Sequence, residues 1–174
     1  TETRSSFLRA WRGVLSPRVS ETTRSAIMAG KMKLFLSIIG EPKPKQSARF
    51  YHTGAIVKSY QTTDVKANES NIKMQVISQL PADFQVTARP IKVTRLHYVF
   101  APIKSLKKSD LKAMSEGELI YKPTKPDLTD NLNKGVFDAL QGIIYANDSQ
   151  VISMDDVKKI YGHRPRIDIE LEIL

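Results

Sequence analysis

The sequence predicts an α+β (mixed α/β) fold, a single domain built on a small mixed sheet of about four strands with helices packed on it. Two observations lead to this prediction. The chain has 174 residues, the size of one domain, and 41% of them are hydrophobic. Segments with strand-like and helix-like hydrophobic spacing alternate in the order β-α-β-(α)-α-β-β. We find no internal repeat in the chain.

The first 31 residues differ from the rest of the sequence. They hold five Arg and one Lys against two Glu, a net charge of +4, and few large apolar residues. This Arg-rich and Ser-rich composition also resembles a transit peptide. We expect residues 1–31 to be an extension that is either artificial or poorly ordered. Residues 7–15 could form a short helix within it. The domain then spans residues 32–174.

The domain begins with a predicted strand, a loop and a helix. Residues 32–39 (MKLFLSII) are short and apolar, as in a buried strand, and stop at Gly40. Residues 41–60 contain two prolines and a Thr53-Gly54 turn signal, so we expect a loop or ribbon. A helix follows from Thr62 or Thr63 to Pro81, because four apolar positions share one helical face: Val65, Ile72, Val76 and Leu80.

The middle of the domain holds a second strand and two further helices. Residues 91–100 form the strand, and a phase change near Leu96 predicts a bulge or burial on both faces. Residues 105–114 predict a short basic helix capped by Ser105 and closed by residues 116–118. Residues 131–141 predict a helix that ends at Gly142 and whose apolar stripe is Leu132, Val136 and Leu140.

Two strands close the chain. Residues 150–161 are expected to form one of them, after a turn at Asn147-Asp148. Residues 166–174 alternate strictly, so one face should enter the core and the other should meet water. The expected core face is Ile167, Ile169, Leu171 and Ile173, and the expected wet face is Arg166, Asp168, Glu170 and Glu172.

Composition narrows the function. There are no cysteines, which excludes disulfides and thiolate metal sites, and the three histidines lie far apart. A bound metal would therefore be a hard ion held by carboxylates, Mg²⁺ or Mn²⁺. The net charge of +9 favours a polyanionic partner, nucleic acid first, although a basic protein without an anionic partner has the same composition. No apolar run reaches the ~20 residues of a membrane span.

The densest group of polar residues surrounds the predicted helix at residues 131–141. Asp127 and Asp130 precede it, Asp148 follows in the next turn, and Lys134 lies four residues after Asp130. Helix capping and turn formation explain these residues without any ligand. The alternative is metal-assisted hydrolysis of a phosphodiester, in which carboxylates hold divalent ions and a lysine contacts the phosphate.

A resemblance favours the second interpretation. The stretch KPDLTDNLNKGVFDALQGIIYANDSQVI resembles the signature of RusA-type endodeoxyribonucleases, the Holliday-junction resolvases of phages and prophages. That signature is approximately K-P-D-x-D-N-x-x-K-x-x-x-D-A-L-x-G, then a short apolar stretch and D-D-x-Q-V. The segments GEPKPKQSARF and KSLKKSDLKAMSEGEL agree more weakly with family segments, so the resemblance covers about residues 32–174.

The resemblance assigns roles to individual residues. Asp130 matches the second family aspartate, Lys134 the essential lysine, and Asp148 the catalytic aspartate of the D-D-x-Q segment. Asp127 departs from the pattern, because the family spacing D-x-D is D-x-x-D here, as if one residue were inserted. Asp127 then reaches the pocket only if the chain bulges before the helix. We interpret Asp138 as structural, through capping or pairing.

The resemblance also implies partners. It implies a Mg²⁺- or Mn²⁺-dependent homodimer that nicks four-way junctions symmetrically, in the cytoplasm of a bacterial host and encoded by a phage or prophage. The basic residues expected along the DNA path, each otherwise a solvated charge, are Lys43, Lys45, Arg49 and Lys58, with Phe50, Tyr51 and Tyr60 interleaved. Two alternatives remain: a junction-binding protein that does not cleave because of the Asp127–Asp130 spacing, and a nucleic-acid-binding module in which the carboxylates only cap.

Overall fold

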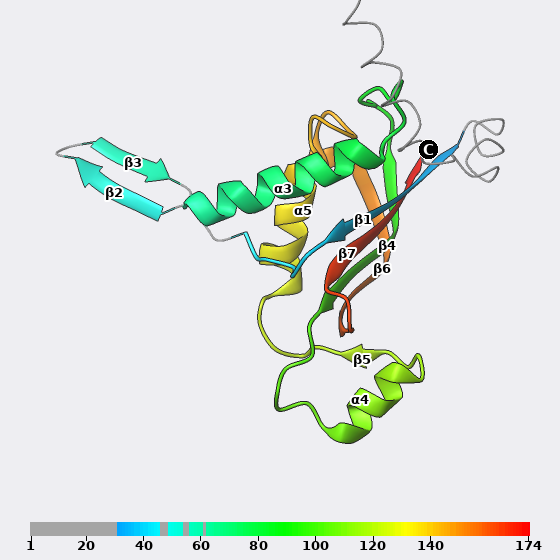
Figure 1. The fold of residues 1–174 in the computed structure, drawn as a ribbon. Coiled ribbons are helices and arrows are strands. Elements are labelled where there is room, and N and C mark those ends of the chain that lie inside the picture. Colours follow the sequence, from blue (N-terminus) through cyan, green and yellow to red (C-terminus); the bar gives the residue numbers. More distant parts are fainter. Residues whose placement is uncertain (1–30, 46–48, 54–55, 61) are drawn as a thin grey trace, which may run out of the picture. The chain divides into compact units, whose positions relative to one another are not determined.

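The computed structural model describes residues 31–45, 49–53, 56–60 and 62–174 (Figure 1). Contacts divide the chain into two units, Thr1–Met32 and Lys33–Leu174, and the second unit carries the candidate residues. Of the extension expected over residues 1–31, residues 1–30, which include the expected short helix, lie outside the described residues. Within the described ranges no helix is both long and apolar enough to cross a bilayer.

A five-stranded sheet forms the centre of the second unit, in the order β1-β7-β4-β6-β5. Its strands are β1 (Met32–Ile39), β4 (Ile91–Phe100), β5 (Ile120–Tyr121), β6 (Val151–Tyr161) and β7 (Arg166–Ile173). β4 pairs with β6 in parallel and with β7 antiparallel, which makes the sheet mixed as predicted. The fifth strand is β5, which is antiparallel to β6 and has only two residues, too few to show a hydrophobic period.

The remaining elements are helices and one hairpin. The loop or ribbon expected at residues 41–60 contains the antiparallel hairpin β2 (Arg49–Thr53) and β3 (Ile56–Tyr60), and Gly54 lies outside the described residues. The helical elements are α3 (Thr63–Gln79), α4 (Lys108–Ser115), the π-helix η2 (Leu128–Asn133), α5 (Lys134–Leu140) and the 3₁₀-helix η3 (Asp148–Gln150).

The core follows the predicted alternation. The inward residues of β7 are 4% exposed or less, and Leu132, Val136 and Leu140 are buried to a similar degree. Val65, Ile72 and Val76 of α3 are buried too, while Leu80, just after the helix, is half-buried. The bulge predicted in β4 is present, because the register with β7 shifts between Val93 and Arg95.

The edge of the sheet at β1 is closed by side chains of α3. The Gln79 amide accepts a hydrogen bond from Ser37 N–H and donates one to Ser37 C=O, both at 2.9 Å. Gln75 makes the same pair of bonds with the backbone of Ile39, at 2.8 and 3.0 Å. These amides occupy backbone groups that would otherwise be open to pairing with another strand.

Two helix boundaries differ from the prediction. α4 begins at Lys108, three residues after the predicted start, because Ser105 lies in a turn and Lys107 occupies the N-cap position without a side-chain cap. The helix predicted at residues 131–141 begins earlier, at Leu128, with a π-helical segment that the 3.6-residue period does not reveal. Gly142 has φ of 77°, the left-handed conformation expected at this end.

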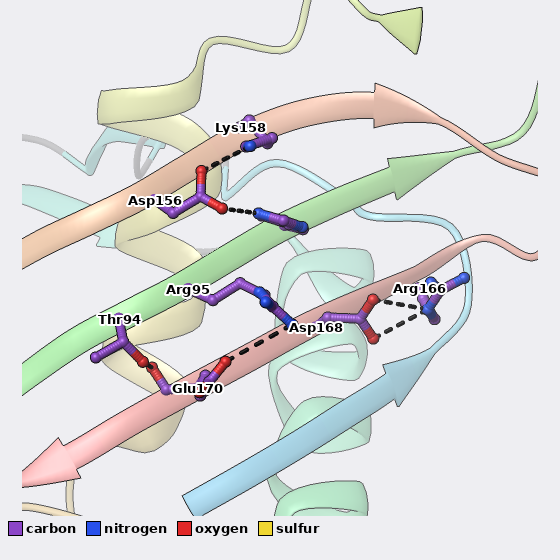
Figure 2. A network of polar contacts seen from close by, with 8 residues as sticks. Thr94, Arg95, Asp156, Lys158, Arg166, Asp168 and Glu170 are labelled. Carbon is purple, nitrogen blue, oxygen red and sulfur yellow. Dashed lines mark hydrogen bonds and ion pairs between the residues drawn. The ribbon is translucent and has the colours of Figure 1, made fainter. Parts of the chain in front are cut away.

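The outer residues of β7 are half-buried rather than fully solvated, because they join ion pairs across the sheet. Figure 2 shows several of these pairs on the near side of β4, β6 and β7, with α3 and α5 behind the strands. We call this side of the sheet the ionic face. Its pairs are Lys33–Glu172, Lys92–Asp155, Arg95–Glu170, His97–Asp156, Lys158–Asp156 and Arg166–Asp168.

Candidate functional site

Lys159 fixes the backbone that leads into the acidic segment. Its ammonium donates hydrogen bonds to the carbonyls of Thr124 and Pro126, both at 2.7 Å, from near the end of β6. Asp127 follows directly as the N-cap residue of η2. The entry to the candidate site is therefore tied to the central sheet. No local signal in the sequence identifies Lys159, since the contact spans more than 30 residues.

The extra residue between Asp127 and Asp130 lies where the helix is π-helical. The N–H of Leu132 donates to the C=O of Asp127 at 3.2 Å, five residues back instead of the four of an α-helix. A π-helix holds one more residue per turn, so it accommodates an insertion without shifting the following α-helix. Such segments occur frequently at functional sites.

The end of η2 and the start of α5 are held from two sides. Asn133 is 7% exposed, and its side-chain oxygen accepts a hydrogen bond from the hydroxyl of Tyr98 in β4 at 2.9 Å. On the other side, the N–H of Lys45 donates to the C=O of Asn131 at 3.0 Å. Gly135 permits this approach, because a Cβ there would lie 3.2 Å from the Cβ of Lys45.

The Lys45 ammonium lies between two carboxylates. It is 2.6 Å from Asp138 of α5 and 3.3 Å from Glu69 of α3, and the Lys45 side chain is 12% exposed. Burial alone would lower the pKa of Lys45, but the hydrogen bonds and charges of Asp138 and Glu69 raise it. The pairing expected for Asp138 is thus present. Loss of DNA binding in a Lys45 variant would also reflect the loss of this ion pair.

A groove between α5 and the start of β6 brings part of the predicted site together. Its lining contains Lys134 and Asp148, along with Asp138, which the sequence analysis had assigned to structure. The full lining is Thr129, Asn133, Lys134, Phe137, Asp138, Asp148 and Met154. Lys134 and Asp148 are exposed, and neither side chain makes an ion pair or hydrogen bond within the part of the chain that the structure describes.

Asp148 is presented by a capped turn. It is the first residue of η3, where the Asn147 side chain accepts from Ser149 N–H at 2.9 Å and the Gln150 side chain accepts from Asn147 N–H at 2.8 Å. Capping therefore falls to Asn147 and leaves the Asp148 carboxylate available. Burial and then the charges of Asp148 and Asp138 raise the pKa of Tyr145, so both carboxylates act on one hydroxyl.

The residues present do not form a ready three-carboxylate metal site. Nowhere in the described residues do three His, Cys, Asp or Glu side chains lie close enough to hold an ion. Asp127 and Asp130 are exposed and do not line the groove, and Asp127 accepts a hydrogen bond from Asn131 at 3.3 Å. Their oxygens are the ligand type that Mg²⁺ prefers, but the three predicted ligands are not gathered.

The other predicted DNA contacts are only partly described. Lys43 is exposed in the loop after β1. Arg49 lies opposite Tyr60, and Lys58 opposite Tyr51, in the register of the β2–β3 hairpin. Phe50 is opposite Ser59. The side chains of this hairpin lie outside the description, so these assignments stay predictions.

Comparisons with known proteins match most of the chain to one protein family. The family model of endodeoxyribonuclease RusA matches residues 40–172, which include the hairpin, the groove and most of the sheet, but not β1. The chain is also similar to the uncharacterized protein YqaN of Bacillus subtilis (strain 168), with 45% identity over 58 residues. That match covers 33% of this chain and 39% of the relative's length.

Proposed function

The chain belongs to the endodeoxyribonuclease RusA family, and on that premise we propose that it is a Mg²⁺- or Mn²⁺-dependent nuclease that resolves four-way DNA junctions by symmetric nicking. We further propose that it acts as a homodimer, so that two sites meet the two strands to be cut. We propose that it acts in the cytoplasm of a bacterial host and that a phage or prophage encodes it.

The groove is the observation that carries this proposal. It places the Lys134 ammonium and the Asp148 carboxylate in one depression, each exposed and without a partner among the described residues. A cation that is not neutralised by a neighbour can bind a phosphate oxygen and stabilise charge that develops on it. A carboxylate beside it would repel phosphate unless a divalent cation lies between them.

The proposed metal ligands are the carboxylates of Asp127, Asp130 and Asp148. Mg²⁺ commonly takes one or two protein carboxylates and completes its shell with water and substrate phosphate. When bound, such an ion would polarise the phosphate and activate a water. Because the three carboxylates are not gathered in the structure, metal dependence is the part of the proposal that experiment must decide.

The second candidate function is junction binding without cleavage. It is favoured by the position of Asp127, which is exposed, bonded to Asn131 and absent from the lining of the groove. A site that lacks this ligand could still hold DNA through Lys134 and the basic surface. The two functions differ in one product, the nicked junction.

The test is a nicking assay on a synthetic four-way junction with and without Mg²⁺. We expect nicking only with the metal. Asp130→Asn and Asp148→Asn should reduce the nicking rate by orders of magnitude with junction affinity kept or improved, because negative charge next to phosphate is removed. Lys134→Ala should also abolish nicking, but without a gain in affinity. Asp83→Asn, in another exposed aspartate, is the matched control.

The outcomes separate the alternatives. If both Asp130→Asn and Asp148→Asn nick at the wild-type rate, these residues only cap helices and form turns, because Asn replaces Asp well at cap and turn positions. Binding of junctions without nicking would support the second candidate. A large loss of nicking in Asp127→Asn would show that the π-helix keeps this residue in reach of the site.

A further inference from the structure

Three lysines without acidic partners lie just before and at the start of α4. Lys104, Lys107 and Lys108 are exposed, and no acidic residue lies between them in the sequence. Among the ion pairs of the described residues, the one in this helix is Lys112–Glu116, at a long 3.7 Å. We call Lys104, Lys107 and Lys108 the α4 lysine cluster.

The ionic face provides a contrast within the same molecule. Its pairs join five Lys or Arg residues to five Asp or Glu residues, which leaves no net charge there apart from His97. Lys45 and Lys73 are likewise paired with carboxylates. The positive excess of the chain therefore does not lie on that face of the sheet, while the α4 lysine cluster is left unneutralised.

Folding gives no evident reason for this cluster. Positive charges near the first turn of a helix oppose the helix dipole and destabilise it by a few tenths of a kcal/mol or more each, and Asp110 is the one acidic residue in the first turn of α4. α4 is attached to the protein by other residues, since Met114 is 9% exposed and Leu111 is half-buried. A charge arrangement that opposes local stability without a structural partner is typical of a binding surface.

The position of α4 connects the cluster to the candidate site. Figure 1 shows α4 beside β5, at the end of the sheet where β4 ends. Ile120 of β5 pairs with Tyr161 of β6, and Lys122 N–H donates to Lys159 C=O at 3.0 Å. Lys159 in turn holds the carbonyls just before Asp127. The helix is thus attached through a short, hydrogen-bonded segment to the start of the acidic segment.

We propose that the α4 lysine cluster binds the phosphate backbone of a duplex arm of the DNA whose cleavage point occupies the groove. The inference rests on the proposed function and names a surface for it. The partner is a polyanion because the cluster offers three exposed cations. Backbone contacts of this kind carry no sequence information, so they should serve every junction sequence alike.

The test compares two triple variants of the full chain with equal change in net charge. The first carries Lys104→Gln, Lys107→Gln and Lys108→Gln. The control carries Lys33→Gln, Lys92→Gln and Lys158→Gln on the ionic face, where the lysines are already paired. Junction affinity is measured from 50 to 200 mM salt, nicking is measured at saturating protein, and melting temperatures verify the fold.

The expected result follows from counterion release. Three lost phosphate contacts should lower the slope of log affinity against log salt by about 2.7, so that between 50 and 200 mM salt the wild type loses about forty-fold more affinity than the cluster variant. The control should keep the wild-type slope. Nicking at saturation should persist in the cluster variant, because the groove is unchanged.

Two failures are distinguishable. If the wild type binds and nicks junctions but the cluster variant keeps the wild-type slope, or changes no more than the control, the lysines are only solvated and the inference is wrong. If the wild type itself neither binds nor nicks junctions, the proposed function fails, and the inference with it.

Discussion

The ion pair between Lys45 and Asp138 gives the sharpest stability prediction. Asp138→Asn keeps the shape of the side chain but removes its charge, which leaves the Lys45 ammonium with Glu69 at 3.3 Å in place of Asp138 at 2.6 Å. Breaking a fully buried pair costs about 3–5 kcal/mol, and a hydrogen bond to a charged group contributes about 1.5–3 kcal/mol.

The lower range applies, because the Asp138 side chain is 28% exposed. We therefore expect a loss of about 2 kcal/mol in the free energy of unfolding, or roughly 4–8 °C in melting temperature for a chain of this length. The assay is urea unfolding at pH 7 beside a thermal melt. Asp156→Asn is the matched control. The Asp156 side chain, which pairs with His97 and Lys158, is 41% exposed, and ion pairs at exposed positions contribute about 0–1 kcal/mol.

A double-mutant cycle isolates the pair. Lys45→Met keeps much of the packing against Gly135, and the double variant should be less destabilised than the sum of the two single variants by about 1.5 kcal/mol or more. Equal stability of Asp138→Asn and the Asp156→Asn control, or additive effects of Lys45→Met and Asp138→Asn, would refute this account of how α5 is held.

Three further predictions concern the fold. Gly162→Ala should cost about 1–3 kcal/mol by urea unfolding, because its Cβ would lie 2.5 Å from the buried side chain of Val99. Tyr98→Phe should cost about 1–3 kcal/mol in the same assay, since it leaves a buried Asn133 oxygen without its donor. The hydrogen bond from Lys73 is the main cause that lowers the pKa of Glu69, and it outweighs the effect of burial. The stability that the Glu69 carboxylate contributes is therefore present above pH ~4.5 and is lost as pH falls through the lowered pKa. Glu69→Gln should therefore lose less stability than the wild type between pH 5 and pH 3.

The sequence predicts best those elements whose period is imposed by one buried face. β7 alternates strictly because its inner residues meet the helices and its outer residues meet charged neighbours, and the apolar positions of α3 follow the same rule. β5 has two residues and therefore no period. The start of α4 was predicted too early because Ser105 is a good cap by type, whereas the structure places it in a turn.

The sequence predicted which residue types form the candidate site better than it predicted which residues they contact. Lys134 and Asp148 were found from the motif, and the structure places both in one groove. The contribution of Asp138 to that groove was missed, because a structural role through capping or pairing explains an aspartate at this helix position equally well. That pairing joins residues 93 positions apart, and no local pattern reveals such a contact.

The π-helix decides how the altered aspartate spacing should be interpreted. An insertion inside an α-helix would rotate every later side chain by about 100°, because each residue advances the helix by that angle. Here the bond from Leu132 to Asp127 encloses the extra residue before Lys134, and α5 then runs in ordinary α-helical register. Lys134 and Asp138 keep the four-residue spacing that puts both in the groove. Among the predicted metal ligands, Asp127 alone precedes the extra residue, so we expect any loss of activity that the insertion causes to be confined to what Asp127 contributes.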